Sequence, residues 1–237
     1  MRAKASLVML ISVVLLGGCA TTPSRISSSE ESQVRAAALE FTQALKAGDA
    51  SRVREMTFAG NDAESQRLAA AVVGDTLTGR GIQMKLAGFA DAQQKAAVVG
   101  SDLWIGEMEA AAETGPILKA GDRVRVGEEW RDGSMFLRQV GTGWKVEVIS
   151  TLVAESGGAP TVADPAVEYR FNVTRAINAW MLERLNAGEF ATFKDYQRSR
   201  NAFWMEYLSR VARGDDPKDL LATLPAMPKE EGIAVER

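Results

Sequence analysis

The sequence predicts an α+β fold in which helices come first, an antiparallel sheet follows and further helices end the chain. Near the start, apolar side chains recur at the spacing of one helix face, at Val34, Ala38, Phe41 and Leu45. Residues 123–153 instead alternate apolar and polar side chains between glycine-containing turns, which is typical of an antiparallel meander. Helical spacing then returns after a break rich in Gly, Ala and Pro.

The segment before the meander is expected to hold three helices. The first ends at Gly48, Asp49 is positioned to cap a short second helix, and a third covers about residues 64–73. The pattern then changes, and residues 82–89 and 96–105 are predicted to be strands.

Two turn signals define the expected meander. Asp132-Gly133 is a strong two-residue hairpin signal between predicted strands at 123–130 and 135–140. A Gly-Thr-Gly turn then leads into a last strand at 144–153, where apolar and charged residues alternate. A sheet with one buried face is the expected result.

The end of the chain is predicted to be helical. A linker at 154–164 precedes a helical region at 165–224, and residues 225–237 form a tail. The aromatic side chains of this region either pack within the molecule, which is the favoured interpretation, or form a face for a partner. The candidates for such a face are Phe193, Phe203, Trp204 and Tyr207.

Composition excludes several kinds of chemistry. The chain has 28 basic and 31 acidic residues, a net charge of −3. It therefore lacks the broad positive field that nucleic acid demands. It has no histidine, which excludes Ser-His-Asp and Cys-His catalysis, and its single cysteine excludes an internal disulfide. No glycine-rich phosphate loop or convincing metal cluster stands out, so no cofactor is expected.

The first residues have the layout of an export signal. Arg2 and Lys4 precede an apolar stretch that is shorter than the roughly 20 residues a membrane-spanning helix needs. The stretch ends in Leu16-Gly17-Gly18-Cys19. This ending resembles the lipobox of bacterial lipoproteins.

The resemblance implies a signal peptide at 1–18, cleavage between Gly18 and Cys19, and acyl chains on Cys19 that hold the protein on a membrane. Family sorting patterns associate the Ala20 that follows with the outer membrane, so the protein is expected in the cell envelope, facing the periplasm. The Ser-rich residues 19–32 are expected to be a flexible tether.

The central region has a resemblance of its own. The segments FTQALKAGDASRVREM and FLRQVGTGWKVEVIS resemble the front helices and the last paired strands of the NTF2-like cone fold. The resemblance implies an NTF2-like domain at 33–153 whose bent sheet and helices enclose a pocket. The candidate pocket residues are Trp104, Glu128, Trp130 and Trp144.

Members of that family that resemble ketosteroid isomerase use an aspartate base and a tyrosine donor. Here the tyrosines are Tyr169, Tyr196 and Tyr207, all beyond the central region, so that catalytic set cannot be transferred. No catalytic residue is assigned.

Three functions remain open at this point. The favoured one is an envelope lipoprotein that binds a partner protein or an apolar ligand without catalysis. The second is an isomerase-type or hydrolase-type enzyme that uses a pocket carboxylate with a raised pKa. The third is an assembly subunit that docks on a larger envelope machine through its C-terminal aromatic helices.

Overall fold

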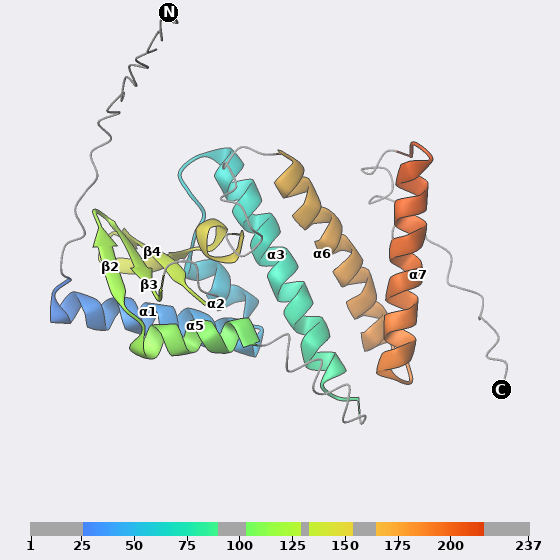
Figure 1. Cartoon of the computed structure of the whole chain (residues 1–237), viewed down its shortest axis with the longest axis horizontal. Helices are drawn as coiled ribbons and strands as arrows, with labels where there is room; N and C mark the ends of the chain where they lie inside the picture. The colour runs from blue at the N-terminus through green and yellow to red at the C-terminus, as the bar shows by residue number, and fades with distance from the viewer. Residues whose placement is uncertain (1–25, 90–102, 129–132, 154–164, 216–237) are drawn as a thin grey trace, which may run out of the picture.

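The computed structural model describes residues 26–89, 103–128, 133–153 and 165–215, and in them helices pack against one face and one side of a five-stranded mixed sheet (Figure 1). This confirms the α+β class. The predicted linker at 154–164 and tail at 225–237 lie outside the described residues, as do residues 216–224 of the predicted helical region.

Two helices open the described chain, α1 (Ser28–Ala47) and α2 (Ala50–Glu55). Helix α1 ends as expected at Gly48, which has a φ of 70°, and the side chain of Asp49 accepts a hydrogen bond from the Arg52 amide at the start of α2.

Helix α1 begins earlier than the predicted domain boundary at residue 33. The hydroxyl of Ser27 accepts a hydrogen bond from the Glu30 amide, 3.2 Å away, and so caps the helix. Residues 28–32 of the predicted 19–32 tether are therefore helical.

The strand predicted at 82–89 is wrong, because helix α3 (Ala63–Leu86) runs through most of it. Ile82 and Leu86 lie four residues apart on one helix face and are buried in a cluster with residues of a later helix. Of the strand predicted at 96–105, the first part lies outside the described residues. Its end belongs to helix α5 (Leu103–Thr114).

The sheet has the strand order β1-β5-β4-β3-β2, with β1 parallel to β5 and all other pairs antiparallel. The strands are β1 (Thr57–Phe58), β2 (Ile117–Ala120), β3 (Arg123–Val126), β4 (Met135–Val140) and β5 (Gly143–Glu147). The three predicted meander strands are thus confirmed in position, although the first ends at Val126 and the last at Glu147. A π-helical turn, η1 (Ile149–Val153), follows it.

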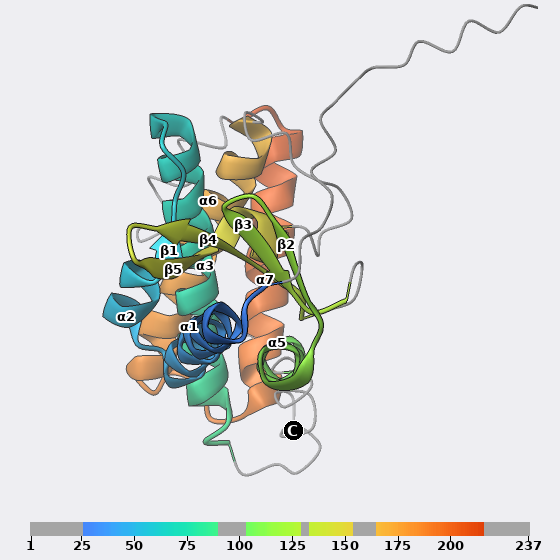
Figure 2. The same cartoon turned by 90° about the vertical axis from the view of Figure 1, so that its left-hand side faces the viewer.

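Helices α1 and α5 cover one face of the sheet (Figure 2). The side chains that fill the space between them are fully buried and large, namely Phe41, Leu45, Met108, Met135 and Leu137. The interior that the sequence predicted to be a ligand pocket is therefore occupied by packed side chains in this part of the structure.

A second layer consists of α3, α6 (Pro165–Asn186) and α7 (Phe193–Ala212), which stand side by side (Figure 1). Gly74 and Gly81 lie seven residues apart on α3. A Cβ atom at either would come within 3 Å of α6, at Arg175 or Leu182 respectively. These glycines let the two backbones approach closely.

Candidate functional site

An open groove of about 400 Å³ lies at one end of the sheet, between α1, α2 and the β4–β5 turn. Its apolar lining consists of Ala36, Ala37, Met56 and Trp144, and its charged rim of Glu40, Arg52, Glu55 and Lys145. An apolar floor with a few polar groups around it is the usual composition of a binding site.

Ion pairs hold the rim of the groove in place. The Arg52 guanidinium on α2 contacts Glu40 on α1 and, at 2.5 Å, Glu55 on its own helix. Hydrogen bonds to Glu55 and then to Glu40 raise the pKa of Arg52 above its ordinary value. The two helices are thereby braced against each other on one side of the groove.

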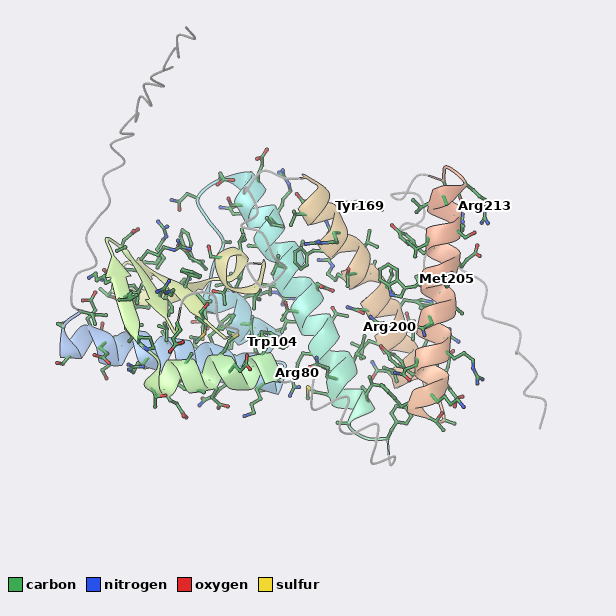
Figure 3. All side chains as sticks on the ribbon, viewed as in Figure 1. Arg80, Trp104, Tyr169, Arg200, Met205 and Arg213 are labelled. Carbon is green, nitrogen blue, oxygen red and sulfur yellow. The ribbon has the colours of Figure 1, made fainter. Side chains whose placement is uncertain are left out.

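Of the four candidate pocket residues, only Trp144 lies at this groove. It is 6% exposed and packs into the main core. Trp104 is half-buried at the start of α5, at the end nearest α3 (Figure 3), and Glu128 is exposed. Trp130 lies outside the described residues. The structure therefore does not bring Trp104 or Glu128 into one site with Trp144.

The candidate partner face on α7 faces inward. Phe203 and Tyr207 are each 6% exposed, and Phe193 and Trp204 are half-buried against the same cluster. The Phe203 ring lies 4.8 Å from that of Trp180 on α6. The Tyr207 hydroxyl lies 2.8 Å from that of Tyr169, which is also on α6 and is labelled in Figure 3. These aromatic residues supply packing between helices of the same molecule.

The most buried acid of the sheet, Glu147, does not face the groove or the filled interior. It points to the opposite face of the sheet, where Arg138 and Arg123 lie 2.7 and 2.8 Å from its two oxygens. The negative charge of a carboxylate that contacts two guanidinium groups is compensated by these ion pairs. This is not the arrangement of a free base in a ligand pocket.

A second acid, Asp75 on α3, is one that sequence reasoning missed. Burial between α3 and α6 raises the pKa of Asp75 to about 6, against the opposing effects of a hydrogen bond from Asn178 and the charge of Arg175. Asp75 lies seven residues after Leu68 and seven residues before Ile82, so the three share one face of α3. The sequence would have shown this if the full length of α3 had been predicted. Asp75 therefore interrupts the buried stripe of the helix.

Replacing Asp75 by Asn is expected to stabilise the protein at pH 7 by about 2 kcal/mol. The pKa lies about two units above its ordinary value, which corresponds to about 3 kcal/mol, and the partial exposure of the carboxyl to solvent reduces this energy. The folded-state pKa lies above the unfolded value, so wild-type stability should fall as pH rises from about 4 through 6. In Asp75→Asn this slope should disappear. Urea unfolding across this pH range measures both effects.

Asp122→Asn is the matched control, because the same chemical change at this exposed residue should shift the free energy of unfolding at pH 7 by less than about 0.5 kcal/mol. A variant Asp75→Asn that is less stable than wild type at pH 7 would mean that the carboxylate stabilises the helix pair.

No family model, curated protein or solved structure matches this chain. The site therefore has to be interpreted from its own geometry. Among the described helices, none combines the length and apolar character needed to cross a bilayer. The described residues also include no cluster of three or more Asp, Glu, His or Cys side chains suited to a metal ion. Gly18 and Cys19, the predicted cleavage and lipidation site, lie outside the described residues.

Proposed function

We propose that the protein is an envelope lipoprotein, anchored by lipid on Cys19 and facing the periplasm from the outer membrane, that works by binding a segment of a partner protein. Its binding site in this proposal is the groove beside Trp144. The N-terminal pattern that ends in Leu16-Gly17-Gly18-Cys19 supports the anchor. The shape of the groove supports a protein partner.

The openness of the groove is the observation on which the choice of partner rests. Small-molecule sites bury most of the surface of their ligand, and enzyme sites exclude water from the reacting atoms. This groove lies open to solvent on the molecular surface. An apolar floor ringed by charges instead fits a protruding apolar side chain of a second protein, with polar contacts around it.

Within the α+β class, the specific fold that we propose is the NTF2-like cone. Two front helices, a short β1, two further helices and an antiparallel meander follow one another in that order, and helices lie on one face of the sheet. The long pairing of α3 with α6 and the filled interior are departures from a ligand-holding cone. An experimental structure with helices on both faces of a flat sheet would contradict this fold assignment.

Photo-crosslinking in living cells tests the groove directly. A photoreactive amino acid at Gln33 or Thr142, two lining positions that are exposed, should yield a discrete protein adduct. The same amino acid at Gln197, exposed on α7, is the control position and should not yield that adduct.

The groove can also be filled without disturbing the core. Ala36 lines it from the exposed side of α1, so Ala36→Trp should leave folding intact and reduce the adduct at least about tenfold, as expected when a central contact is blocked. Equal adduct formation in wild type and Ala36→Trp, or identical adducts from Gln197, would contradict the proposal.

A further inference from the structure

One edge of strand β5 is only partly covered. On one side β5 pairs with β4 over residues 143–146, whereas on the other side β1 pairs only with Val146 and Glu147. The reason is that helix α2 continues to Glu55, so the chain becomes extended only at β1. Among the described residues, no strand lies beside 143–145 on the β1 side, at the end of the sheet where α2, β1 and β5 meet (Figure 2).

The free edge presents the backbone of Trp144. The Val146 amide points away from β4, because it donates a hydrogen bond to the Met56 carbonyl, 2.8 Å away. Backbone groups alternate in direction along a strand, so the N–H and C=O of Trp144 point to the same side as those of Val146. Within the described part of the chain, no hydrogen bond joins the Trp144 backbone to a residue on this side. Its buried indole N–H lacks a partner as well. An unpaired N–H and C=O at a sheet edge are a template for a further strand.

The groove lies along this free edge. Its lining includes residues 143–145 of β5, Met56 between α2 and β1, and Ala36 and Ala37 on α1. Residues that lie directly opposite each other in paired strands place their side chains on the same face of the sheet. Trp144 faces α1, since it is buried in the core that α1 covers. A residue paired with Trp144 would therefore direct its side chain toward the two small alanines.

Lys145 adds a second preference. Its side chain lies on the opposite face from that of Trp144, and its cross-strand neighbour on β4 is another cation, Arg138. Arg138 contacts Glu147 and Asp122, but Lys145 makes no ion pair in the described part of the chain. An acidic side chain beside Lys145 on an added strand would supply one.

We propose that the partner segment binds in extended conformation as an added strand on β5, in line with β1, and exchanges backbone hydrogen bonds with Trp144. The residue of the segment opposite Trp144 is apolar and enters the groove, and the adjacent residue, opposite Lys145, is acidic. In strand addition the main chain supplies affinity and the side-chain sites supply specificity. This proposal rests on the partner binding of the proposed function and adds a conformation, a register and a sequence preference to it.

The test measures hydrogen exchange at single backbone amides of the full-length protein, with a synthetic strand tethered beside the groove. The probe is acetyl-Thr-Glu-Leu-Glu-Thr followed by a short glycine linker, which is coupled to an azide-bearing amino acid at Gln33, an exposed lining position. Tethering raises the effective concentration of the peptide to the millimolar range, so that even a weakly binding strand occupies the edge.

In the free protein, the Trp144 amide should exchange faster than the Val146 amide, which is bonded to Met56. With the tethered probe, exchange at Trp144 should slow by at least about fivefold, as expected when a strand occupies the edge about four fifths of the time. A probe that is N-methylated at its leucine and at the following glutamate should give no such slowing. It keeps the side chains but lacks the central N–H donors.

Two pairs of variants give matched controls. Ala36→Trp fills the groove and should remove the slowing at Trp144, whereas Ala212→Trp, the same change at an exposed site on α7, should preserve it. Lys145→Glu should reduce the slowing with this probe and restore it with a probe that carries lysines in place of both glutamates. The N-methylated probe needs neither variant, so it decides the question even if one of them fails to fold.

Unchanged exchange at Trp144 with the tethered probe, or equal slowing with the N-methylated probe, would overturn the proposal. Exchange at Trp144 that is as slow as at Val146 in the free protein would also overturn it, because the edge would then be closed. Slowing that appears without any probe as the protein concentration rises would assign the edge to a second copy of this chain, against a foreign segment.

Failure of the proposed function has a different signature. In that case photo-crosslinking at Thr142 yields no adduct in cells, while the probe still slows exchange at Trp144 and supports strand addition at this edge. A cellular adduct at Thr142 without any slowing by the probe would keep the partner and refute its binding as a strand.

Discussion

Replacing Cys19 by Ala is expected to abolish incorporation of labelled palmitate into the protein and to leave residues 1–18 uncleaved. Cys19 is the only cysteine of the chain, so no other thiol can carry the label. Each buried methylene contributes about 0.8 kcal/mol to membrane attachment, and one acyl chain is marginal while two or three hold a protein firmly. Metabolic labelling followed by gel fluorography measures the loss, and the mass of the purified chain reports cleavage.

The membrane distribution needs a second variant, because an uncut apolar start can itself hold a chain on a membrane. When residues 1–19 are replaced by an export signal that is cleaved without lipidation, nearly all of the protein should move to the soluble periplasmic fraction. If that variant still sediments with membranes at high salt, or if Cys19→Ala keeps its palmitate, the anchor is refuted.

Local patterns predicted much of the fold. The end of α1 and the start of α2 follow from Gly48 and Asp49, and the meander follows from alternation between turns that glycine accommodates. In these segments the local preference and the tertiary environment agree, since each buried side chain lies on the face that its period indicates. Where the two agree, the sequence alone is enough to predict the local structure.

Helix α3 shows where local patterns fail. Ile82, Met84 and Leu86 alternate as in a strand, and this alternation favoured a strand over a continued helix. In the structure the segment continues α3, where Gly74 and Gly81 permit close contact with α6, and of these three residues only Ile82 and Leu86, four residues apart, are buried. Nothing local reveals a partner helix some hundred residues later in the chain, so tertiary packing decided the outcome.

Of the residues that line the groove, only Trp144 was predicted from the sequence as a pocket residue. The groove also requires α1 and α2 to be braced by Arg52, and Arg52 meets Glu40 from a different helix. Such a contact depends on the angle between two helices, which no spacing rule supplies. Glu147 was expected on the polar face of its strand and lies there, but its burial arises from arginines on two other strands.

Gly133→Ala, in the turn before β4, is expected to destabilise the protein by about 3 kcal/mol. Gly133 has a φ of 86°, a backbone conformation that costs an L-residue about 1–2 kcal/mol. A Cβ atom there would also lie 2.5 Å from the carbonyl carbon of Glu107 and 2.7 Å from the Met108 nitrogen. These are backbone atoms of α5, so the contact can be relieved only by moving the start of β4 away from that helix, which typically costs about 1–3 kcal/mol.

Gly141→Ala separates the two contributions, because Gly141 has a similar φ of 62° but no atom within 4 Å of the added Cβ. Denaturant unfolding should show a loss of about 1 kcal/mol for Gly141→Ala and about 2 kcal/mol more for Gly133→Ala. Equal losses would mean that the backbone angle alone accounts for the effect and that α5 does not press on the start of β4. The larger loss at Gly133 would instead show that close contact with α5 holds this end of the sheet over the core.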